Sequence, residues 1–312
     1  MAGKVVVLGS INIDLLVSTP RLPCAGETVS GISLTRQLGG KGANQAVGAA
    51  RAGAPCILLA AVGMDQDGSA MVAALDSYGV DTGRVRATSS ATGCAVVATS
   101  PIDNQIIHIA GANSDVDAAM AAQVDLGPDD VCLAQMETPV AATAALFQNA
   151  RAAGACTILN AAPASIAALS LLPLCDLLIV NEGELAVLAG SDAGLALDDD
   201  SLLSSRRLLG LQPDQSLLVT LGAKGLAIIK ADEIQRIAGR QATVVDTTGA
   251  GDCFCGYLAA GLARGDAIGR AAVEANAAAS IAIRSLGAAA SIPGRDAVLQ
   301  SLECHPDISS TT

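Results

Sequence analysis

The chain has 312 residues, enough for one large domain, and 51% of them are hydrophobic although only 1% are aromatic. A core of Ala, Val, Leu and Ile argues against stacking on nucleic-acid bases, and a formal net charge of -12 argues against nucleic-acid or anionic membrane partners. The nine cysteines are scattered and odd in number, and the N-terminus reads as a strand, which favours a cytoplasmic protein with reduced thiols and a small-molecule partner.

Apolar strands and Ala-rich helices alternate along most of the chain. Strands are predicted at 4–10, 56–63, 130–135, 157–162, 176–181, 216–222 and 225–230, and helices at 43–54, 68–80, 141–155 and 253–265. This alternation predicts an α/β fold, a three-layer α/β/α domain whose mostly parallel sheet has helices on both faces. We expect residues 1–312 to form this one domain.

Two further strand-like segments interrupt the alternation. They lie at 27–39 and 92–111, and the second is folded back at the turn sequence SPIDN. We expect a small β-sheet lid formed by two insertions, about 14–38 and 92–111, over one edge of the main domain. Its exposed apolar face suits a dimer contact equally well.

The sequence VVVLGSINID carries the first candidate site residues. Asn12 and Asp14 stand at the end of a predicted strand. Ligands of open α/β sheets bind beyond the carboxyl ends of the strands, and alternate residues point to the same side, so these two side chains are placed to bind neighbouring hydroxyl groups. A simple Asx turn explains the same pattern.

The sequence LGGKGANQA places Gly39, Gly40 and Gly42 before a predicted helix. It matches neither the phosphate-binding loop G-x-x-x-x-G-K-[ST] nor the dinucleotide pattern G-x-G-x-x-G. Glycines allow a ligand to approach the backbone, Lys41 adds one charge, and Asn44 can donate and accept hydrogen bonds. A glycine-rich cap alone leaves Lys41 and Asn44 unexplained.

Several single polar residues end apolar segments further along the chain. Asn113 and Glu137 are of this kind, and helix capping or solvent exposure explains each as well as ligand binding does. Asn181 closes a strand and Glu184 follows three residues later, which fits a capping box. The same pair also fits an amide near phosphate and a carboxylate that holds water on Mg²⁺, an ion that keeps several waters.

The sequence LVTLGAKG ends another strand with Thr220, Gly222 and Gly225. A tight turn at this point can pass beside a nucleotide, and a simple hairpin is the alternative. The residues alone leave both interpretations open.

The sequence VVDTTGAGDCF contains two aspartates around a glycine-rich turn. The two valines are predicted to end a strand, and Gly249, Ala250 and Gly251 to lie at a helix N-terminus, whose free N–H groups and dipole form an anion site without Lys or Arg. Asp252 fits a first-turn helix cap, but a carboxylate beside an anion site is better explained as the group that takes a proton during phosphoryl transfer. Asp246 lies further back and is expected to face a cation.

Taken together, these residues resemble the ribokinase family of carbohydrate kinases. The similarity runs from VVVLGSINID to SLGAAASIP, and its most specific pieces are GGKGAN and DTTGAGD, in the order and separation that this family shows. The resemblance implies an ATP-dependent transfer of the γ-phosphate to O5 of D-ribose, which gives D-ribose 5-phosphate and ADP. Asp252 would be the general base, and the amides of Gly249, Ala250 and Gly251 the anion hole.

The resemblance also assigns the remaining candidates. The sugar-binding positions are Asn12, Asp14, Gly40, Lys41, Asn44, Glu137 and Asp252, and the nucleotide-binding positions are Asn181, Thr220, Gly222, Gly225, Gly251 and Asn276. Glu184 would act on Mg²⁺ through water. A monovalent cation, commonly K⁺, would be held at Asp246, Thr248, Ala282, Ser285, Gly287 and Ser291, and the family often has Arg where Ser285 stands. The β lid also forms the contact in homodimers of this family.

Three interpretations compete with a ribose kinase. Another kinase of the family, acting on deoxyribose, a nucleoside or another sugar, would retain Asp252 and change the lid contacts. Asn12, Asp14 and Lys41 favour a small polyhydroxylated sugar, and the scarcity of aromatic residues disfavours stacking on a nucleobase. A non-catalytic sugar- or nucleotide-binding regulator is disfavoured by the intact base and anion hole, and a Rossmann dehydrogenase by the missing glycine pattern.

Overall fold

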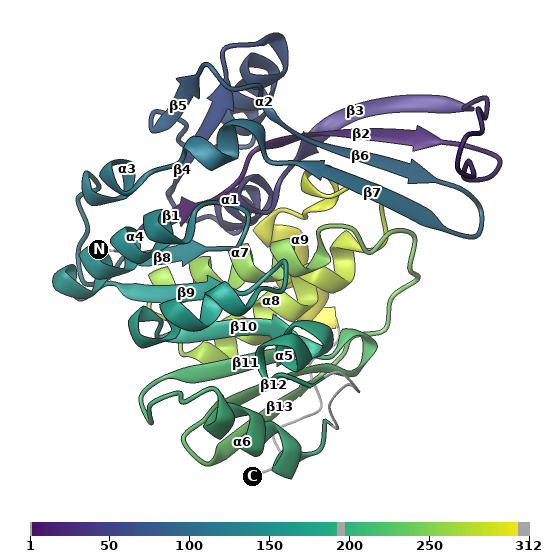
Figure 1. The fold of residues 1–312 in the computed structure, drawn as a ribbon. Helices are drawn as coiled ribbons and strands as arrows, with labels where there is room; N and C mark the ends of the chain where they lie inside the picture. Colours follow the sequence, from purple (N-terminus) through teal and green to yellow (C-terminus); the bar gives the residue numbers. More distant parts are fainter. Residues whose placement is uncertain (1, 192–196, 305–312) are drawn as a thin grey trace.

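The computed structural model describes residues 2–191 and 197–304. Within them, nine strands form one sheet in the order β13-β12-β11-β10-β9-β8-β1-β4-β5 (Figure 1). The strands are β1 (Val5–Leu8), β4 (Cys56–Gly63), β5 (Val85–Thr88), β8 (Val131–Ala134), β9 (Cys156–Asn160), β10 (Leu177–Asn181), β11 (Ser216–Thr220), β12 (Gly225–Lys230) and β13 (Glu233–Ala238). Neighbours from β5 to β11 run parallel, and only β12 and β13 continue antiparallel, which confirms a mostly parallel sheet.

Strand β1 lies inside the sheet and is buried along its whole length. Val5 to Leu8 pair with residues 56–59 of β4 on one side and 131–134 of β8 on the other. All four side chains are fully buried, and three of them are the β-branched Val, which suits a strand with both faces covered. Burial of each such side chain contributes about 1.5–3 kcal/mol to folding.

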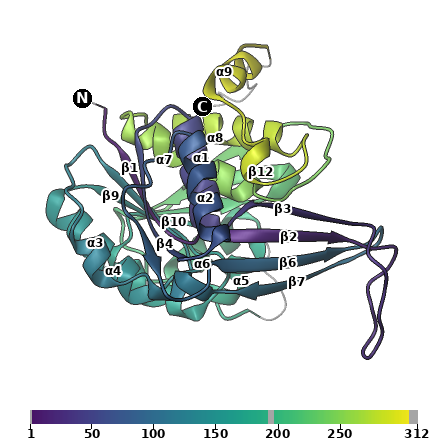
Figure 2. The same ribbon diagram turned by 90° about the horizontal axis from the view of Figure 1, so that it is seen from above.

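Helices cover both faces of the main sheet (Figures 1 and 2). One face carries α1 (Lys41–Arg51), α2 (Gln66–Ser77), α7 (Ala250–Ala263), α8 (Ile268–Ala282) and α9 (Arg295–Cys304), and the other carries α3 (Ala118–Ala122), α4 (Val140–Ala153), α5 (Glu182–Leu188) and α6 (Asp199–Leu208). Short 3₁₀ helices are η1 (Gly111–Asp115), η2 (Ile166–Leu174), η3 (Gly222–Lys224) and η4 (Ala289–Ser291). A separate apolar cluster fills the space under each helix layer, so the three-layer prediction is confirmed. None of the described helices is long and apolar enough to cross a membrane.

Glycines allow helices α1 and α7 to pack closely. A Cβ atom added to Gly256 of α7 would lie 2.3 Å from the carbonyl oxygen of Gln45, and one added to Gly48 of α1 would lie 3.2 Å from the Cα atom of Gly256. Larger side chains would therefore push the two helices apart. This close approach brings the first turns of α1 and α7, which carry Asn44 and Asp252, next to each other.

The second sheet has four strands in the order β3-β2-β6-β7 and projects from the main domain (Figure 2). Its strands are β2 (Asn12–Ser18), β3 (Ser33–Gly39), β6 (Gly93–Thr99) and β7 (Asn104–Ile109). The expected small sheet is therefore present, and β6 folds back onto β7 as predicted. The strand predicted at 27–39 begins only at Ser33, because the largely exposed residues 27–32 belong to a loop in which Glu27 binds Arg21.

The prediction that Asn12 and Asp14 end the first strand is wrong. Strand β1 ends at Leu8, and both residues lie within β2. The chain leaves the main sheet between these strands, and β2 then pairs with β3 and β6 of the second sheet. Both side chains are thus carried by the small sheet, at its junction with the main domain.

Two other local predictions are also wrong. Gly42 lies inside the first turn of α1 and not before it, because the left-handed turn that starts this helix falls at Gly40, whose φ is 92°. The valines at 244 and 245 do not form a strand. The amide of Val245 donates instead to the carbonyl oxygen of Ile283 (2.8 Å), so the segment pairs with the loop after α8.

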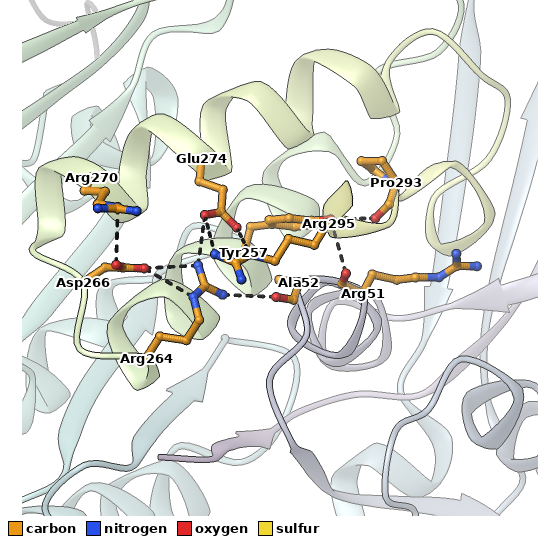
Figure 3. Close-up of polar contacts among 9 residues, drawn as sticks. All are labelled: Arg51, Ala52, Tyr257, Arg264, Asp266, Arg270, Glu274, Pro293 and Arg295. Atoms are coloured by element: carbon orange, nitrogen blue, oxygen red, sulfur yellow. Dashed lines mark hydrogen bonds and ion pairs between the residues drawn. The ribbon is translucent and has the colours of Figure 1, made fainter. Parts of the chain in front are cut away.

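A network of buried charges joins the ends of several helices (Figure 3). Glu274 of α8 is only 5% exposed and accepts hydrogen bonds from Arg264 (3.0 Å) and Arg295 (2.9 Å). Arg264 also pairs with Asp266 and donates to the carbonyl oxygen of Ala52, just after α1 (3.1 Å). These contacts attach α9 and the end of α1 to the helix layer formed by α7 and α8.

Candidate active site

Asp252 lies in the first turn of α7 and is only 6% exposed. Its Oδ2 atom accepts a hydrogen bond from Nδ2 of Asn44 (3.1 Å), and its Oδ1 atom accepts one from Nε2 of Gln45 (2.9 Å). Burial raises the pKa of Asp252; Lys41 and the two amides oppose this rise, and Glu137 adds to it. A carboxylate with a raised pKa is suited to take a proton near neutral pH.

The N-terminus of α7 offers free backbone amides. Gly249 caps the helix with a φ of 74°, and a Cβ atom on it would lie 2.7 Å from that of Ala288, so the position requires glycine. The amide of Ala250 already donates to the carbonyl oxygen of Thr247 (3.2 Å). Gly251 is an exposed residue, and within the described ranges nothing accepts a hydrogen bond from its backbone amide. Of the three amides expected in an anion hole, those of Gly249 and Gly251 thus remain for a ligand.

Several predicted sugar ligands share one electrostatic environment with Asp252. Burial, and then the negative charges of Glu137 and Asp252, raise the pKa of Asp14 to about 7. Burial opposes a charge on Lys41, but Asp252, Glu137 and Glu184 outweigh it and raise the pKa of this lysine. The cluster is therefore a crowded acidic site that also contains the half-buried Lys41.

Glu137 follows β8 and binds the loop that starts α1. Its Oε2 atom accepts hydrogen bonds from Oγ of Ser10 (2.5 Å) and from the amide of Lys41 (3.1 Å). A Cβ atom on Gly40 would lie 2.8 Å from the carbonyl oxygen of Ser10, so this close approach of the two backbone segments requires glycine. Oε2 thus acts as a helix cap, whereas Oε1 accepts no hydrogen bond from any described residue.

Two buried asparagines have different surroundings. Asn113 is fully paired with the start of β2: its Oδ1 atom accepts from the amide of Ile11 (2.9 Å), and its Nδ2 atom donates to Oδ1 of Asn12 (2.7 Å). By contrast, the buried Oδ1 atom of Asn44 has no hydrogen-bond partner among the described residues. An unpaired buried acceptor costs about 1–3 kcal/mol, so this atom favours a ligand that brings a donor such as a hydroxyl group.

A cavity of about 720 Å³ opens beside the N-terminus of α7. Five predicted nucleotide-binding residues line it: Thr220, Gly222, Gly225, Gly251 and Asn276. The turn at 221–225 is indeed a hairpin between β11 and β12, and it borders the cavity as well, so the two interpretations of this turn are compatible. The volume lies within the range of small-molecule sites.

Asn181 does not line this cavity. It is exposed and forms a capping box at the start of α5. Its Oδ1 atom accepts a hydrogen bond from the backbone amide of Glu184 (2.8 Å), and its backbone amide donates to Oε2 of Glu184 (2.8 Å). Burial raises the pKa of Glu184, and the hydrogen bond from Asn181 opposes the rise. The capping interpretation therefore describes the observed contacts of this pair.

Asp246 holds together the two segments that contain the predicted monovalent-cation residues, the loop at 246–248 and the stretch from Ala282, the last residue of α8, to Ser291, the last residue of η4. Its Oδ1 atom accepts from the amide (2.9 Å) and hydroxyl (2.6 Å) of Thr248, and its Oδ2 atom accepts from the amide of Gly287 (2.9 Å). Partial burial opposes ionisation, but these hydrogen bonds keep the pKa of Asp246 below its ordinary value. In the part of the chain that the structure describes, no three His, Cys, Asp or Glu side chains converge as a metal site, so a cation here would rely on carbonyl and hydroxyl oxygens.

A family model for pfkB family carbohydrate kinases matches residues 2–295. The chain belongs to the pfkB family of carbohydrate kinases. A ribokinase of Haemophilus influenzae is 34% identical to this pfkB kinase over 97% of the present chain and 99% of the relative. The structure of Arabidopsis thaliana ribokinase complexed with ribose and ATP is 32% identical, covers 97% and 99% of the two chains, and has a TM-score of 0.84. For ribokinase from Cryptococcus neoformans in complex with ADP the identity is 32%, the coverage 96% and 99%, and the TM-score 0.83.

The side-chain amides that bind Asp252, directly or through Gln45, were not predicted from the sequence of this pfkB kinase. Gln45 contacts Asp252 directly, and Gln135 and Asn160 contact Gln45. One signal was present: Gln135 and Asn160 stand at the carboxyl ends of β8 and β9, as ligand-binding residues of parallel sheets do. Gln45 follows Asn44 on a predicted helix and gave no signal of its own.

Proposed function

We propose that this kinase transfers the γ-phosphate of ATP to O5 of D-ribose and gives D-ribose 5-phosphate and ADP. The observation that carries the proposal is the place of Asp252. It is a buried carboxylate that interacts electrostatically with Asp14, Lys41 and Glu137, and it directly follows Gly251, which lines the cavity. The similarity to ribokinases over nearly the whole chain supports ribose as the acceptor.

In the proposed reaction, Asp252 takes the proton from the O5 hydroxyl group as O5 attacks the γ-phosphorus. The new O5–P bond forms while the bond from the γ-phosphorus to the bridging oxygen breaks, and its electron pair leaves with ADP. The amides of Gly249 and Gly251 stabilise the charge that develops on the transferred group. Ala250 contributes to this anion hole only if its amide leaves Thr247.

Sugar and nucleotide bind on opposite sides of Asp252 in this proposal. The unpaired Oδ1 atom of Asn44 and the free Oε1 atom of Glu137 accept hydrogen bonds from sugar hydroxyl groups. The remaining proposed sugar ligands are Asn12, Asp14, Gly40 and Lys41. ATP occupies the 720 Å³ cavity, lined by Thr220, Gly222, Gly225 and Asn276, and extends toward Asn181 at the start of α5.

Two metal ions complete the proposal. Glu184 would hold water molecules of Mg²⁺, an ion that neutralises charge on the ATP phosphates when bound. K⁺ would lie between the loops that Asp246 joins, with Thr248, Ala282, Ser285, Gly287 and Ser291 as the other proposed contacts. Because Ser285 is too short to replace a long arginine side chain, its proposed contribution is limited to its own oxygen atoms.

The four-stranded sheet is proposed to act as the lid and as the dimer contact. It exposes large apolar side chains, among them Leu34, Ile106, Ile107 and Ile109. An apolar surface of this kind is typical of protein interfaces. Sedimentation velocity tests the homodimer, and a monomer at micromolar concentration would exclude it.

A cytoplasmic location is proposed because all nine cysteines are free thiols. Fractionation of cells, followed by an activity assay of each fraction, tests this location.

The deciding experiment is ADP formation from ATP and Mg²⁺ with D-ribose, with and without K⁺. Parallel assays contain 2-deoxyribose, adenosine or fructose 6-phosphate as acceptors. We expect ribose-dependent turnover that K⁺ increases. Preference for another acceptor would retain the phosphoryl-transfer mechanism and reject the ribose assignment. Absence of turnover with all four would favour the sugar-binding regulator.

Ribose affinity is expected to fall below neutral pH because of Asp14. Its pKa of about 7 means that much of the unliganded protein carries it protonated at neutral pH. Sugar hydroxyl groups bind the ionised form, so binding releases a proton, and the Kd rises up to about tenfold per pH unit as the pH falls through this pKa. Calorimetry between about pH 6 and 8 in buffers of different ionisation enthalpy measures both effects. Asp14→Asn is the control, and a wild-type Kd independent of pH would contradict the prediction.

Asp246→Asn is expected to weaken activation by K⁺. Loss of the carboxylate charge and of the acceptor for Gly287 loosens both loops, so the K⁺ concentration for half-maximal activity rises about tenfold or more. Titrations of activity with KCl measure this concentration, and choline chloride at equal ionic strength controls for salt effects. An unchanged K⁺ response in this variant would remove Asp246 from the cation site.

A further inference from the structure

A chain of buried amides leads from the main sheet to Asp252. Gln45 is fully buried, and its Nε2 atom donates both to Oδ1 of Asp252 (2.9 Å) and to Oδ1 of Asn160 (3.0 Å). Its Oε1 atom accepts from Nε2 of Gln135 (2.7 Å), which is itself 1% exposed. Asn160 donates through Nδ2 to the carbonyl oxygen of Ile179 in the neighbouring strand β10 (3.3 Å).

We propose that Gln45 is a positioning residue for the general base, and that Gln135 and Asn160 hold its amide so that the nitrogen faces Asp252. The inference rests on the proposed function in one respect, the role of Asp252 as the base. Gln45 has no exposed surface, so it acts on the reaction through Asp252 and does not contact substrate.

The partners of Gln45 allow only one orientation of its amide group. With the two ends exchanged, its oxygen would face two acceptor oxygens, those of Asp252 and Asn160. Asn160 is held in turn by a backbone carbonyl of β10. The direction of the hydrogen bond to Asp252 is thus determined by the main sheet, a rigid element.

Neutral amides, and not a paired cation, hold the carboxylate. Asn44 binds one carboxylate oxygen and Gln45 the other, and Asp252 takes part in no ion pair among the described residues. A directly paired arginine or lysine would stabilise the ionised form strongly and weaken the base. Two amides keep the carboxylate plane in place and leave each oxygen a further lone pair for the substrate proton.

Other titratable groups also act on Asp252 and have to be separated from Gln45 in the test. They are Asp14 on β2, Lys41 on α1, Glu137 after β8, Glu184 on α5, and Cys253 and Cys255 on α7 itself. The two cysteines are buried, and burial raises the pKa of their thiols well above neutral. Substitution of Gln45 by an uncharged residue changes none of these groups.

The test compares Gln45→Leu and Gln135→Leu with a matched control, Gln215→Leu. Gln215 is also a buried glutamine with hydrogen bonds at both ends of its amide, to the carbonyl oxygen of Leu172 (2.6 Å) and from the amide of Gln212 (2.7 Å). In Gln45→Leu the lost donor raises the pKa of Asp252, so the acid limb of the kcat profile moves up by about one pH unit or more. The high-pH plateau of kcat falls about tenfold or more because the base is less well oriented, whereas KM for ribose and ATP stays unchanged.

Gln135→Leu keeps the hydrogen bond from Gln45 to Asp252 but removes the donor that binds Oε1 of Gln45. We therefore expect the acid limb of its kcat profile to move in the same direction as in Gln45→Leu, by a smaller amount. This variant also serves if Gln45→Leu fails to fold. Gln215→Leu is expected to lower thermal stability and leave the profile in place. An acid limb that stays at the wild-type pH in both site variants, or that moves equally in Gln215→Leu, would overturn the proposal.

A second measurement separates this inference from the proposed function. The carboxyl band of Asp252 in the infrared spectrum is identified as the one that disappears in Asp252→Asn. Titration of this band by difference spectroscopy measures the pKa of Asp252 without substrate. If no acceptor turns over, the proposed function fails, but a band that titrates at higher pH in Gln45→Leu still supports the positioning contact. A band that titrates at the same pH in Gln45→Leu and wild type rejects the contact, whatever the enzyme phosphorylates.

Discussion

Asp252→Asn is expected to lower kcat by about 10²–10⁴-fold with D-ribose and ATP, the usual contribution of a general base. The substitution keeps the shape of the side chain, and the oxygen of the new asparagine can still accept a hydrogen bond from the side-chain amide of Asn44 or Gln45. It removes the group that takes the proton from O5. We therefore expect calorimetry to show ribose and ATP binding within a few-fold of wild type, and the loss to appear in kcat. Folding is not expected to suffer, because a buried charge with an unfavourable environment is removed.

The matched control for this prediction is Asp296→Asn. Asp296 also lies in the first turn of a helix, α9, but it is exposed and is not among the groups that act on Asp252. If Asp252 served only as a first-turn carboxylate, the two variants would behave alike. Turnover of Asp252→Asn close to that of the control would exclude its role as base.

Glu274→Gln is expected to destabilise the protein by about 3 kcal/mol without a comparable loss of activity. Glu274 is the shared acceptor for Arg264 and Arg295, whose side chains are only 17% and 32% exposed, so its neutralisation leaves two partly buried cations without their main partner. The contacts of α9 to α8 weaken first, because Arg295 belongs to α9 (Figure 3). Urea unfolding measures the free energy, and kcat at a temperature where the variant is folded separates stability from catalysis.

A matched control for this loss is Asp232→Asn. The pair of Arg207 and Asp232 has similar geometry, at 2.8 Å, but its side chains are 66% and 79% exposed. Exposed pairs contribute below about 1 kcal/mol, since water already solvates both charges. Equal destabilisation of the two variants would show that burial of the Glu274 network has no special energetic role.

Local features of the fold were predictable from the sequence because they depend on neighbours in the chain. The alternation of Val-rich and Ala-rich segments predicted the parallel sheet and its helix layers, and the turn sequence SPIDN predicted the β6–β7 hairpin. Predictions failed where a distant partner decided the outcome. Val244 and Val245 have strong strand propensity, yet neither lies in a strand, and the amide of Val245 donates to the carbonyl oxygen of Ile283 after α8.

The α/β class and the position of Asp252 at the start of a helix follow from local patterns of the sequence, among them the ordered motifs GGKGAN and DTTGAGD. The surroundings of this carboxylate, in contrast, depend on contacts between distant parts of the chain. Gln45 lies 207 residues from Asp252, and Asn160 lies 115 residues from Gln45, so no local pattern relates them. Close packing of α1 and α7 at Gly48 and Gly256 brings Gln45 and Asp252 together, and burial, not residue type, is the largest cause of the raised pKa values of Asp14 and Asp252.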